Sequence, residues 1–142
     1  MKLFFSFVVI SIASTSIFAQ NIKSTPIGTP EILYNENGVT ISSQMTECYN
    51  KDRKETMNFK LLSIVNNSTT PATLKVRCDS YYDGKCYTCE NDEYTFTFNI
   101  AVNETKSGTC DSNPSLQVFY SMKDGYIKEV LTDFKMNVVR LH

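Results

Sequence analysis

Residues 93–102 read EYTFTFNIAV, a stretch that alternates between apolar and polar side chains along most of its length. The apolar side chains of one parity are those of Tyr94, Phe96, Phe98, Ile100 and Val102. Successive side chains of a β-strand point to opposite faces of its sheet. The pattern therefore predicts that residues 93–102 form a strand with one buried and one solvated face.

Similar patterns recur about every ten to fifteen residues between turn-forming residues, which is typical of an all-β sandwich or barrel. Strands are predicted at residues 31–34, 39–45, 56–65, 73–82, 93–102, 116–122 and 134–141. Asn37-Gly38 tolerates positive φ and predicts a tight turn between the first two. Seven strands in about 110 residues suit a two-sheet sandwich of immunoglobulin or fibronectin type. Residues 124–132 show a weak three-four spacing, which predicts at most a single turn of helix.

Two of these strands indicate which side faces the core. The inward parity expected for residues 73–82 comprises Leu74, Val76 and Cys78. The side expected to be buried in residues 56–65 comprises Met57, Phe59, Leu61 and Val65. Leu62 and Ile64 make the second side of that strand apolar as well. A strand that is apolar on both sides is expected in the middle of a sheet.

The start of the chain has the three-part layout of a secretory signal peptide. Met1 and Lys2 give a positive start, residues 3–13 are mostly apolar, and residues 14–19 are mainly small. The apolar run of about eleven residues is shorter than the roughly 20 that cross a bilayer as a helix. We expect residues 1–19 to be removed, which makes the protein secreted or periplasmic without stable membrane insertion. An uncleaved anchor is the alternative, because Ile17 is bulky for its position.

The remaining residues, 20–142, are enough for one domain. Residues 20–30 contain two prolines, a glycine and few large apolar side chains, which predicts a flexible N-terminal segment before a β-sandwich domain at residues 31–142. Loss of Lys2 lowers the 14 basic residues to 13, against 15 acidic ones, so the net charge is near minus two. Such a charge gives no broad attraction to phosphate backbones, and nucleic acid is not an expected partner.

The five cysteines are Cys48, Cys78, Cys86, Cys89 and Cys110. Thiols of an exported chain normally pair. Cys78 lies on the inward parity of its strand, so we expect it to be a buried reduced thiol. Two intervening residues keep Cys86 and Cys89 close, and the predicted bridges are Cys86–Cys89 and Cys48–Cys110. Crossed pairing of Cys48 with Cys86 or Cys89 is the alternative, which the distance between Cα atoms decides.

Cys86-Tyr87-Thr88-Cys89 has the spacing of a dithiol redox motif, in which a helix N-terminus or a nearby cation stabilises one thiolate. The surrounding segment has more negative than positive charge and no helix start, which favours a structural disulfide. Zinc would need four ligands, and the only histidine is His142. That lone histidine gives no internal imidazole for a triad. We expect no catalytic residue, no metal site and no cofactor.

Acidic residues cluster near the same motif: Asp79, Asp83, Glu90, Asp92 and Glu93. Calcium requires six to eight oxygens that converge on one point, and this spacing matches no calcium loop, so a solvated acidic rim is favoured. The tyrosines nearby are Tyr81, Tyr82 and Tyr87. Tyrosine is common on surfaces that recognise proteins or glycans. The three form a candidate binding rim, and the alternative is that they fill the end of the sandwich.

Three segments carry a resemblance to a protein family: YYDGKCYTC (residues 81–89), YTFTFNIAVNETKSGTC (94–110) and LTDFKMNVVRL (131–141). They resemble a group of short, uncharacterised bacterial secreted proteins with a signal peptide and one immunoglobulin-like β-sandwich. The resemblance implies a fold and not an activity. Cys78 departs from the four-cysteine pattern of that group.

Three hypotheses about function follow. The first is a non-enzymatic module of the cell envelope that binds an envelope protein or a glycan through loops at one end of the sandwich. The second is a thiol-disulfide oxidoreductase that uses Cys86 and Cys89. The third is a structural domain without a ligand.

Overall fold

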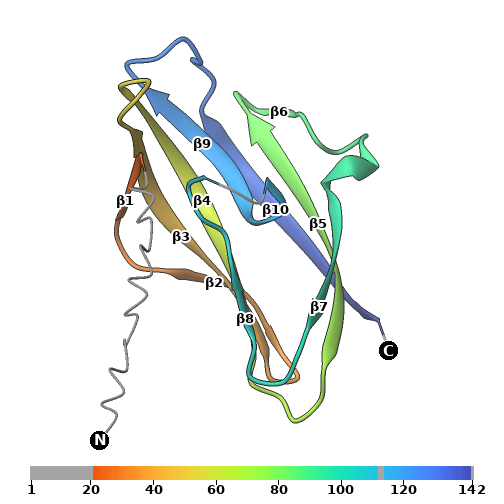
Figure 1. Cartoon of the computed structure of the whole chain (residues 1–142). Helices are drawn as coiled ribbons and strands as arrows, with labels where there is room; N and C mark the ends of the chain where they lie inside the picture. Colours follow the sequence, from red (N-terminus) through yellow and green to blue (C-terminus); the bar gives the residue numbers. More distant parts are fainter. Residues whose placement is uncertain (1–20, 112–113, 142) are drawn as a thin grey trace, which may run out of the picture.

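A computed structural model describes residues 21–111 and 114–141 and is all-β in that part (Figure 1). The strands are β1 (Ile22–Pro26), β2 (Glu31–Glu36), β3 (Val39–Asn50), β4 (Glu55–Asn66), β5 (Ala72–Tyr82), β6 (Lys85–Cys86), β7 (Thr95–Ile100), β8 (Thr105–Ser107), β9 (Gln117–Lys123) and β10 (Leu131–Leu141). Two 3₁₀ turns are η1 (Asp92–Tyr94) and η2 (Pro114–Leu116). The expected signal peptide, 1–19, and His142 lie outside the described residues. No helix in the described part is long and apolar enough to span a membrane.

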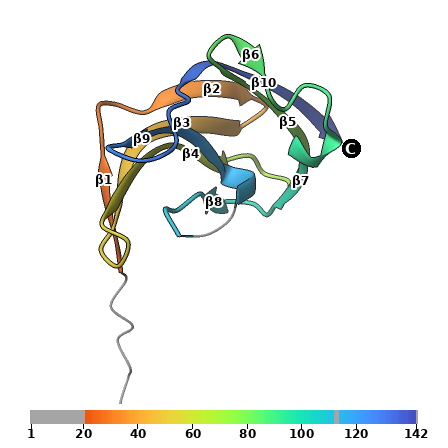
Figure 2. The ribbon, with the colours of Figure 1, turned by 90° about the horizontal axis from the view of Figure 1, so that it is seen from above.

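The strands form two antiparallel sheets. In the larger sheet β1 and β2 both pair with β3, β3 pairs with β4, and β4 pairs with β8 and β9. In the smaller sheet β5 pairs with β10 on one side and with β7 and β6 on the other. Seen from above, β1, β3 and β4 lie on one side of the molecule and β5 and β7 on the other (Figure 2). The predicted all-β class and two-sheet arrangement are confirmed.

The core lies between the inner faces of the two sheets. The most deeply buried aliphatic side chains are Val39, Ile41, Ile64, Leu74, Val76, Ile100 and Leu116. Burial of each large aliphatic side chain contributes about 1.5–3 kcal/mol relative to leaving it in water. Leu74, Val76 and Cys78 of β5 are all buried, which confirms the inward parity predicted for this strand. The positive φ values of Asn37 and Gly38 confirm the tight turn between β2 and β3.

In the second half of β4 the buried side is opposite to the predicted one. Leu62, Ile64 and Asn66 are buried, whereas the side chains expected inside are only partly buried: Met57, Phe59, Leu61 and Val65. Both sides of the strand are apolar around residues 61–65, so alternation does not decide which side faces β5. Along β3 the buried positions change parity between Ser43 and Thr46. Met45, which has the same parity as Val39 and Ile41, is therefore only partly buried.

The described residues form ten strands instead of about seven, because β1, β6 and β8 were not predicted, and several boundaries also differ. Residues 22–26 of the expected flexible segment form β1, whose Ile22 lies opposite Asn50 of β3. An edge strand needs few apolar side chains because the hydrogen-bonded ladder supplies its contacts. Residues 124–130 contain no helix, and β10 begins at Leu131 because that side chain is buried opposite Tyr82. The strand expected at 93–102 is shortened to residues 95–100, since η1 precedes it.

An excursion interrupts the edge of the larger sheet between β8 and β9. Ser107 pairs with Ser63 and Gln117 pairs with Leu61, so the chain leaves this edge and rejoins it only two positions further along β4. The Gly108 N–H donates to the Leu62 carbonyl at 2.8 Å. A Cβ on Gly108 would overlap the Leu116 carbonyl oxygen, which explains the glycine. The described parts of the excursion carry Cys110 and place Leu116 in the core.

Both predicted disulfides are present in the structure. Cys48 of β3 is joined to Cys110, with 5.6 Å between their Cα atoms, and Cys86 is joined to Cys89 at 5.8 Å. These distances lie in the usual range for bridged residues. Cys78 is unpaired and buried, as predicted.

The two bridges are expected to contribute unequally to stability. Cys48–Cys110 closes a separation of 62 residues and Cys86–Cys89 one of 3. By loop-closure entropy, Ala at both positions should lower the free energy of unfolding by roughly 4 kcal/mol for the first bridge and roughly 2 kcal/mol for the second. Denaturant unfolding of the two double variants measures both losses. A larger loss for the Cys86–Cys89 variant would contradict this ranking.

Candidate functional site

The end of β5 is bordered by a hairpin that follows the strand. β7 pairs with residues 72–77 of β5, and β6 pairs with Tyr81 and Tyr82. Between the parts of β5 that pair with β7 and β6, the β5 backbone bonds to the buried Thr88 side chain and not to a strand. The Thr88 Oγ1 accepts the Ser80 N–H at 2.8 Å and donates to the Cys78 carbonyl at 3.0 Å. The hydroxyl therefore satisfies a donor and an acceptor that would otherwise be unpaired.

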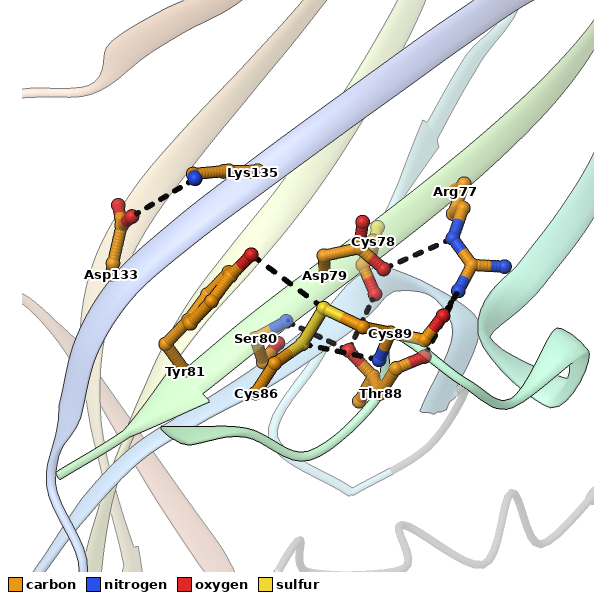
Figure 3. The surroundings of a disulfide bond; sticks show 10 residues. All are labelled: Arg77, Cys78, Asp79, Ser80, Tyr81, Cys86, Thr88, Cys89, Asp133 and Lys135. Atoms are coloured by element: carbon orange, nitrogen blue, oxygen red, sulfur yellow. Dashed lines mark hydrogen bonds and ion pairs between the residues drawn. A yellow bond between two sulfur atoms is a disulfide. The ribbon is translucent and has the colours of Figure 1, made fainter. Parts of the chain in front are cut away.

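Arg77 on the outer face of β5 fixes this hairpin (Figure 3). Its Nη2 donates to the carbonyls of Thr88 at 3.1 Å and Cys89 at 2.5 Å. Its Nε donates to Asp79 at 3.0 Å, and its Nη1 to Asp92 at 3.2 Å. A planar guanidinium presents five N–H donors in a fixed fork on three nitrogens, whereas the three donors of a lysine share one nitrogen. Arg77 thereby ties the loop of the Cys86–Cys89 bridge to the sheet.

The charges around the Cys86–Cys89 bridge oppose a thiolate, although the Cys89 N–H donates to Cys86 Sγ at 3.1 Å. A carboxylate oxygen of Asp79 and the two sulfurs all lie within 4.8 Å of one another. The Arg77 guanidinium contacts carbonyl and carboxylate oxygens, and the 3₁₀ turn η1 begins only after Cys89. A nearby carboxylate disfavours a second negative charge on sulfur. The carboxylate opposes a thiolate at this bridge and the Cys89 N–H favours one at Cys86.

Asp79, Cys86 and Cys89 are the only group of three metal-ligand side chains that converges in the described part of the chain. Both sulfurs are used in the disulfide, and Asp79 is paired with Arg77. Two further acidic residues of the predicted rim, Glu90 and Asp92, are exposed. These acidic side chains form a solvated surface and not a convergent set of oxygens.

The structure separates the three tyrosines of the predicted rim. Tyr82 and Tyr87 lie together, with ring centroids 5.5 Å apart and ring planes at 90°. The Tyr82 hydroxyl donates to the Phe119 carbonyl at 2.7 Å. Tyr81 lies on the other face of the sheet, where its hydroxyl is 3.5 Å from Cys89 Sγ and Lys135 Nζ is 4.9 Å from its ring centroid. Only Tyr82 and Tyr87 therefore belong to one surface.

Tyr82 and Tyr87 line a cleft of about 370 Å³ between the two sheets, which we name the aromatic cleft. Its six aromatic residues are Phe59, Tyr82, Tyr87, Tyr94, Phe96 and Phe119. The inward residues of β5 explain its position, because Leu74 and Val76 are followed by the smaller Cys78 and Ser80. Smaller side chains leave space that the facing rings do not fill.

Sequence reasoning missed most of this cleft. Tyr94 and Phe96 were expected only to fill a buried strand face, yet both line the cleft. Phe59 and Phe119 meet through pairing of β4 and β9, with ring centroids 5.9 Å apart. The decrease in side-chain size from Leu74 and Val76 to Cys78 and Ser80 is the feature of the sequence that could have indicated the cleft.

A larger hollow of about 500 Å³ lies on the outer face of the smaller sheet. It is lined by Lys75, Arg77, Asp92, Thr95, Asn137 and Val139. Arg77 and Asp92 neutralise each other there, and the guanidinium already holds the hairpin. The aromatic cleft is the better candidate, because ligand sites are usually concave and mostly apolar with few polar groups.

Comparison of this chain with family models, with curated proteins and with solved structures gives no match. The candidate site therefore depends on geometry and chemistry alone.

Two groups that line the cleft have altered acidities. Burial, and then the charge of Asp79, raise the pKa of the Cys78 thiol from 9.0 to about 11. Burial, and then Tyr94, raise the pKa of Tyr82 from 10.0 to about 12. The Cys78 thiol is therefore a poor nucleophile at neutral pH.

These shifts predict loss of stability in base. Between pH 9 and 11 the unfolded chain has lost the Cys78 proton and the folded chain retains it, so the free energy of unfolding falls as pH rises. A shift of this size corresponds to about 2 to 3 kcal/mol. Denaturant unfolding across this range should show a shallower fall for Cys78→Ala than for the wild type. Parallel pH curves for the two proteins would contradict the assignment.

Proposed function

We propose that this chain is a non-enzymatic binding module, secreted or periplasmic, that recognises an envelope protein or a glycan at the end of an immunoglobulin-like sandwich. The observation that carries this proposal is the aromatic cleft with exposed tyrosine rings at its mouth. Tyr87 is 60% exposed and Tyr94 is 40% exposed. Rings of this kind give apolar contact and a hydroxyl together, which suits recognition of proteins and sugars.

The fixed position of Tyr87 supports recognition. Its ring contacts Tyr82 edge-to-face, and its N–H donates to the Ser80 carbonyl at 3.0 Å. The neighbouring Thr88 is buried and bonded to β5. A ring held in place before binding loses less conformational entropy when a ligand arrives. Exposure of a preorganised aromatic side chain is the usual property of an interface anchor.

The export of the chain is supported by its signal-like first 19 residues and by the two disulfides. Disulfides persist in oxidising compartments outside the cytoplasm. The proposed partners are components of the envelope, and neither nucleic acid nor stable membrane insertion forms part of the proposal.

The alternative function is a thiol-disulfide oxidoreductase that uses Cys86 and Cys89. The motif spacing favours it, but Asp79 beside the sulfurs and the bonding of the hairpin to Arg77 favour a structural bridge.

The reduction potential of the Cys86–Cys89 bridge distinguishes the two functions. We expect a value below about −300 mV, as is typical of structural disulfides. A variant with Ala at positions 48 and 110 leaves this bridge as the only one and can be equilibrated with dithiol buffers. A potential in the range of catalytic oxidoreductases would support the alternative.

Binding to envelope material tests the proposed function directly. Mature wild-type protein on a resin should retain a specific protein or polysaccharide from its own cell envelope. Tyr87→Ala should reduce retention at least about tenfold, because an anchor residue at an interface contributes 2 kcal/mol or more. Tyr126→Ala is the matched control, since Tyr126 is 74% exposed and does not line the cleft. Equal retention by both variants would contradict the proposal.

A further inference from the structure

The lining of the aromatic cleft is electrically neutral. No charged side chain lines it in the described part of the chain. The nearest acidic residue of β5, Asp79, points to the opposite face, where it is bonded to Arg77. A charged group moved from water into such a site loses its hydration without gaining a partner, which costs several kcal/mol.

The polar groups inside the cleft already have partners within the protein. The Tyr82 hydroxyl donates to the Phe119 carbonyl, and the Thr88 hydroxyl bonds to the Ser80 N–H and to the Cys78 carbonyl. A ligand at this depth therefore finds mainly ring faces and edges, a thiol and aliphatic groups, together with the Ser80 hydroxyl, which interacts with Tyr82. Such a surface favours binding of an apolar group, because a ligand group that needs hydrogen bonds finds few free partners there.

The most exposed part of the cleft is its mouth, although the buried Ser80 and Thr88 also line its interior. Cys78 and Val118, at 5% and 6% exposure, form the deep part. Tyr87 and Tyr94 are much more exposed and lie where the cleft meets water. Each phenol directs a hydroxyl to solvent or to a ligand while its ring continues the apolar wall. The site is therefore mainly apolar inside and hydrogen-bonding at the entrance.

We propose that the aromatic cleft binds a neutral, largely apolar small molecule, with its apolar body between the two sheets and its polar end beside Tyr87 and Tyr94. This inference goes beyond the proposed function, because it assigns a small molecule to the interior of the cleft, whose mouth carries the tyrosines proposed to contact the envelope partner. The volume of about 370 Å³ lies within the range of small-molecule pockets.

Two related dyes test the neutrality of the ligand. Phenylnaphthylamine is neutral and apolar, and anilinonaphthalene sulfonate has the same rings with an added negative charge. Fluorescence titration of the mature, disulfide-bonded protein should give saturable binding of phenylnaphthylamine at one site. Its affinity should exceed that of the sulfonate at least about tenfold, because the charge cannot be desolvated in this cleft. Equal or tighter binding of the sulfonate would overturn the proposal.

The thiol of Cys78 reports whether the dye occupies the cleft. Slow alkylation of Cys78 by N-ethylmaleimide can be followed by mass spectrometry of the intact chain. At a dye concentration about ten times its Kd the rate should fall about tenfold, since only the unoccupied fraction reacts. Dye binding without protection of Cys78 would place the dye elsewhere and overturn the proposal.

Two matched variants complete the test. Tyr87→Ala removes part of the entrance wall and should weaken dye binding at least about fivefold, with equal loss of Cys78 protection at a fixed dye concentration. Tyr126→Ala should bind as the wild type does, since Tyr126 lies outside the cleft. Both residues are exposed, so both variants should fold normally. Equal dye affinity for the two variants would count against the site.

The envelope-binding and dye-binding experiments together distinguish a failure of this inference from a failure of the proposed function. If envelope material binds through Tyr87 but phenylnaphthylamine does not bind, the function stands and the ligand class is wrong. If neither binds, both proposals fail.

Discussion

The Cys48–Cys110 disulfide constrains the segment on which one wall of the aromatic cleft depends. The chain leaves the sheet edge after Ser107 of the short strand β8 and returns to it at Gln117 of β9, and the bridge adds a covalent restraint to the hydrogen bonds at these two points. The bridge joins this excursion to β3, on the far side of β4 in the larger sheet. Leu116, at the end of the excursion, then enters the core, and Phe119 reaches the cleft. Stability and the candidate site therefore depend on the same covalent bond.

The opposite wall depends on polar contacts around Arg77. Its ion pairs with Asp79 and Asp92 are partly exposed, and exposed ion pairs contribute little. Its bonds to the carbonyls of Thr88 and Cys89 matter more, because they order a segment without regular backbone pairing. Thr88 then completes the edge of β5, and Tyr87 is held over Tyr82. One wall is thus fixed covalently and the other by hydrogen bonds.

Local patterns in the sequence predicted the elements better than their orientation. The period-two pattern located β5 and its inward face, and Asn37-Gly38 located a turn, because these features depend on neighbouring residues only. The buried side of β4 was predicted wrongly, since both sides are apolar and only the packing of β5 decides between them. The separation of Tyr81 from Tyr82 follows from alternation and was available in the sequence. The contact between Phe59 and Phe119 could not be predicted from the sequence, because it depends on the register between β4 and β9.

The inner face of β5 shows why a cleft exists where a core would be more stable. Its residues decrease in size from Leu74 and Val76 to Cys78 and Ser80, although nothing in the backbone of this strand changes. Unfilled space of this kind destabilises a protein, because the surrounding side chains lose packing contacts. Larger apolar residues at Cys78 and Ser80 would fill the space between the sheets and remove the opening under Tyr87. Natural proteins depart from close packing mainly at functional sites, so an unfilled space bordered by fixed aromatic rings is expected at a binding site.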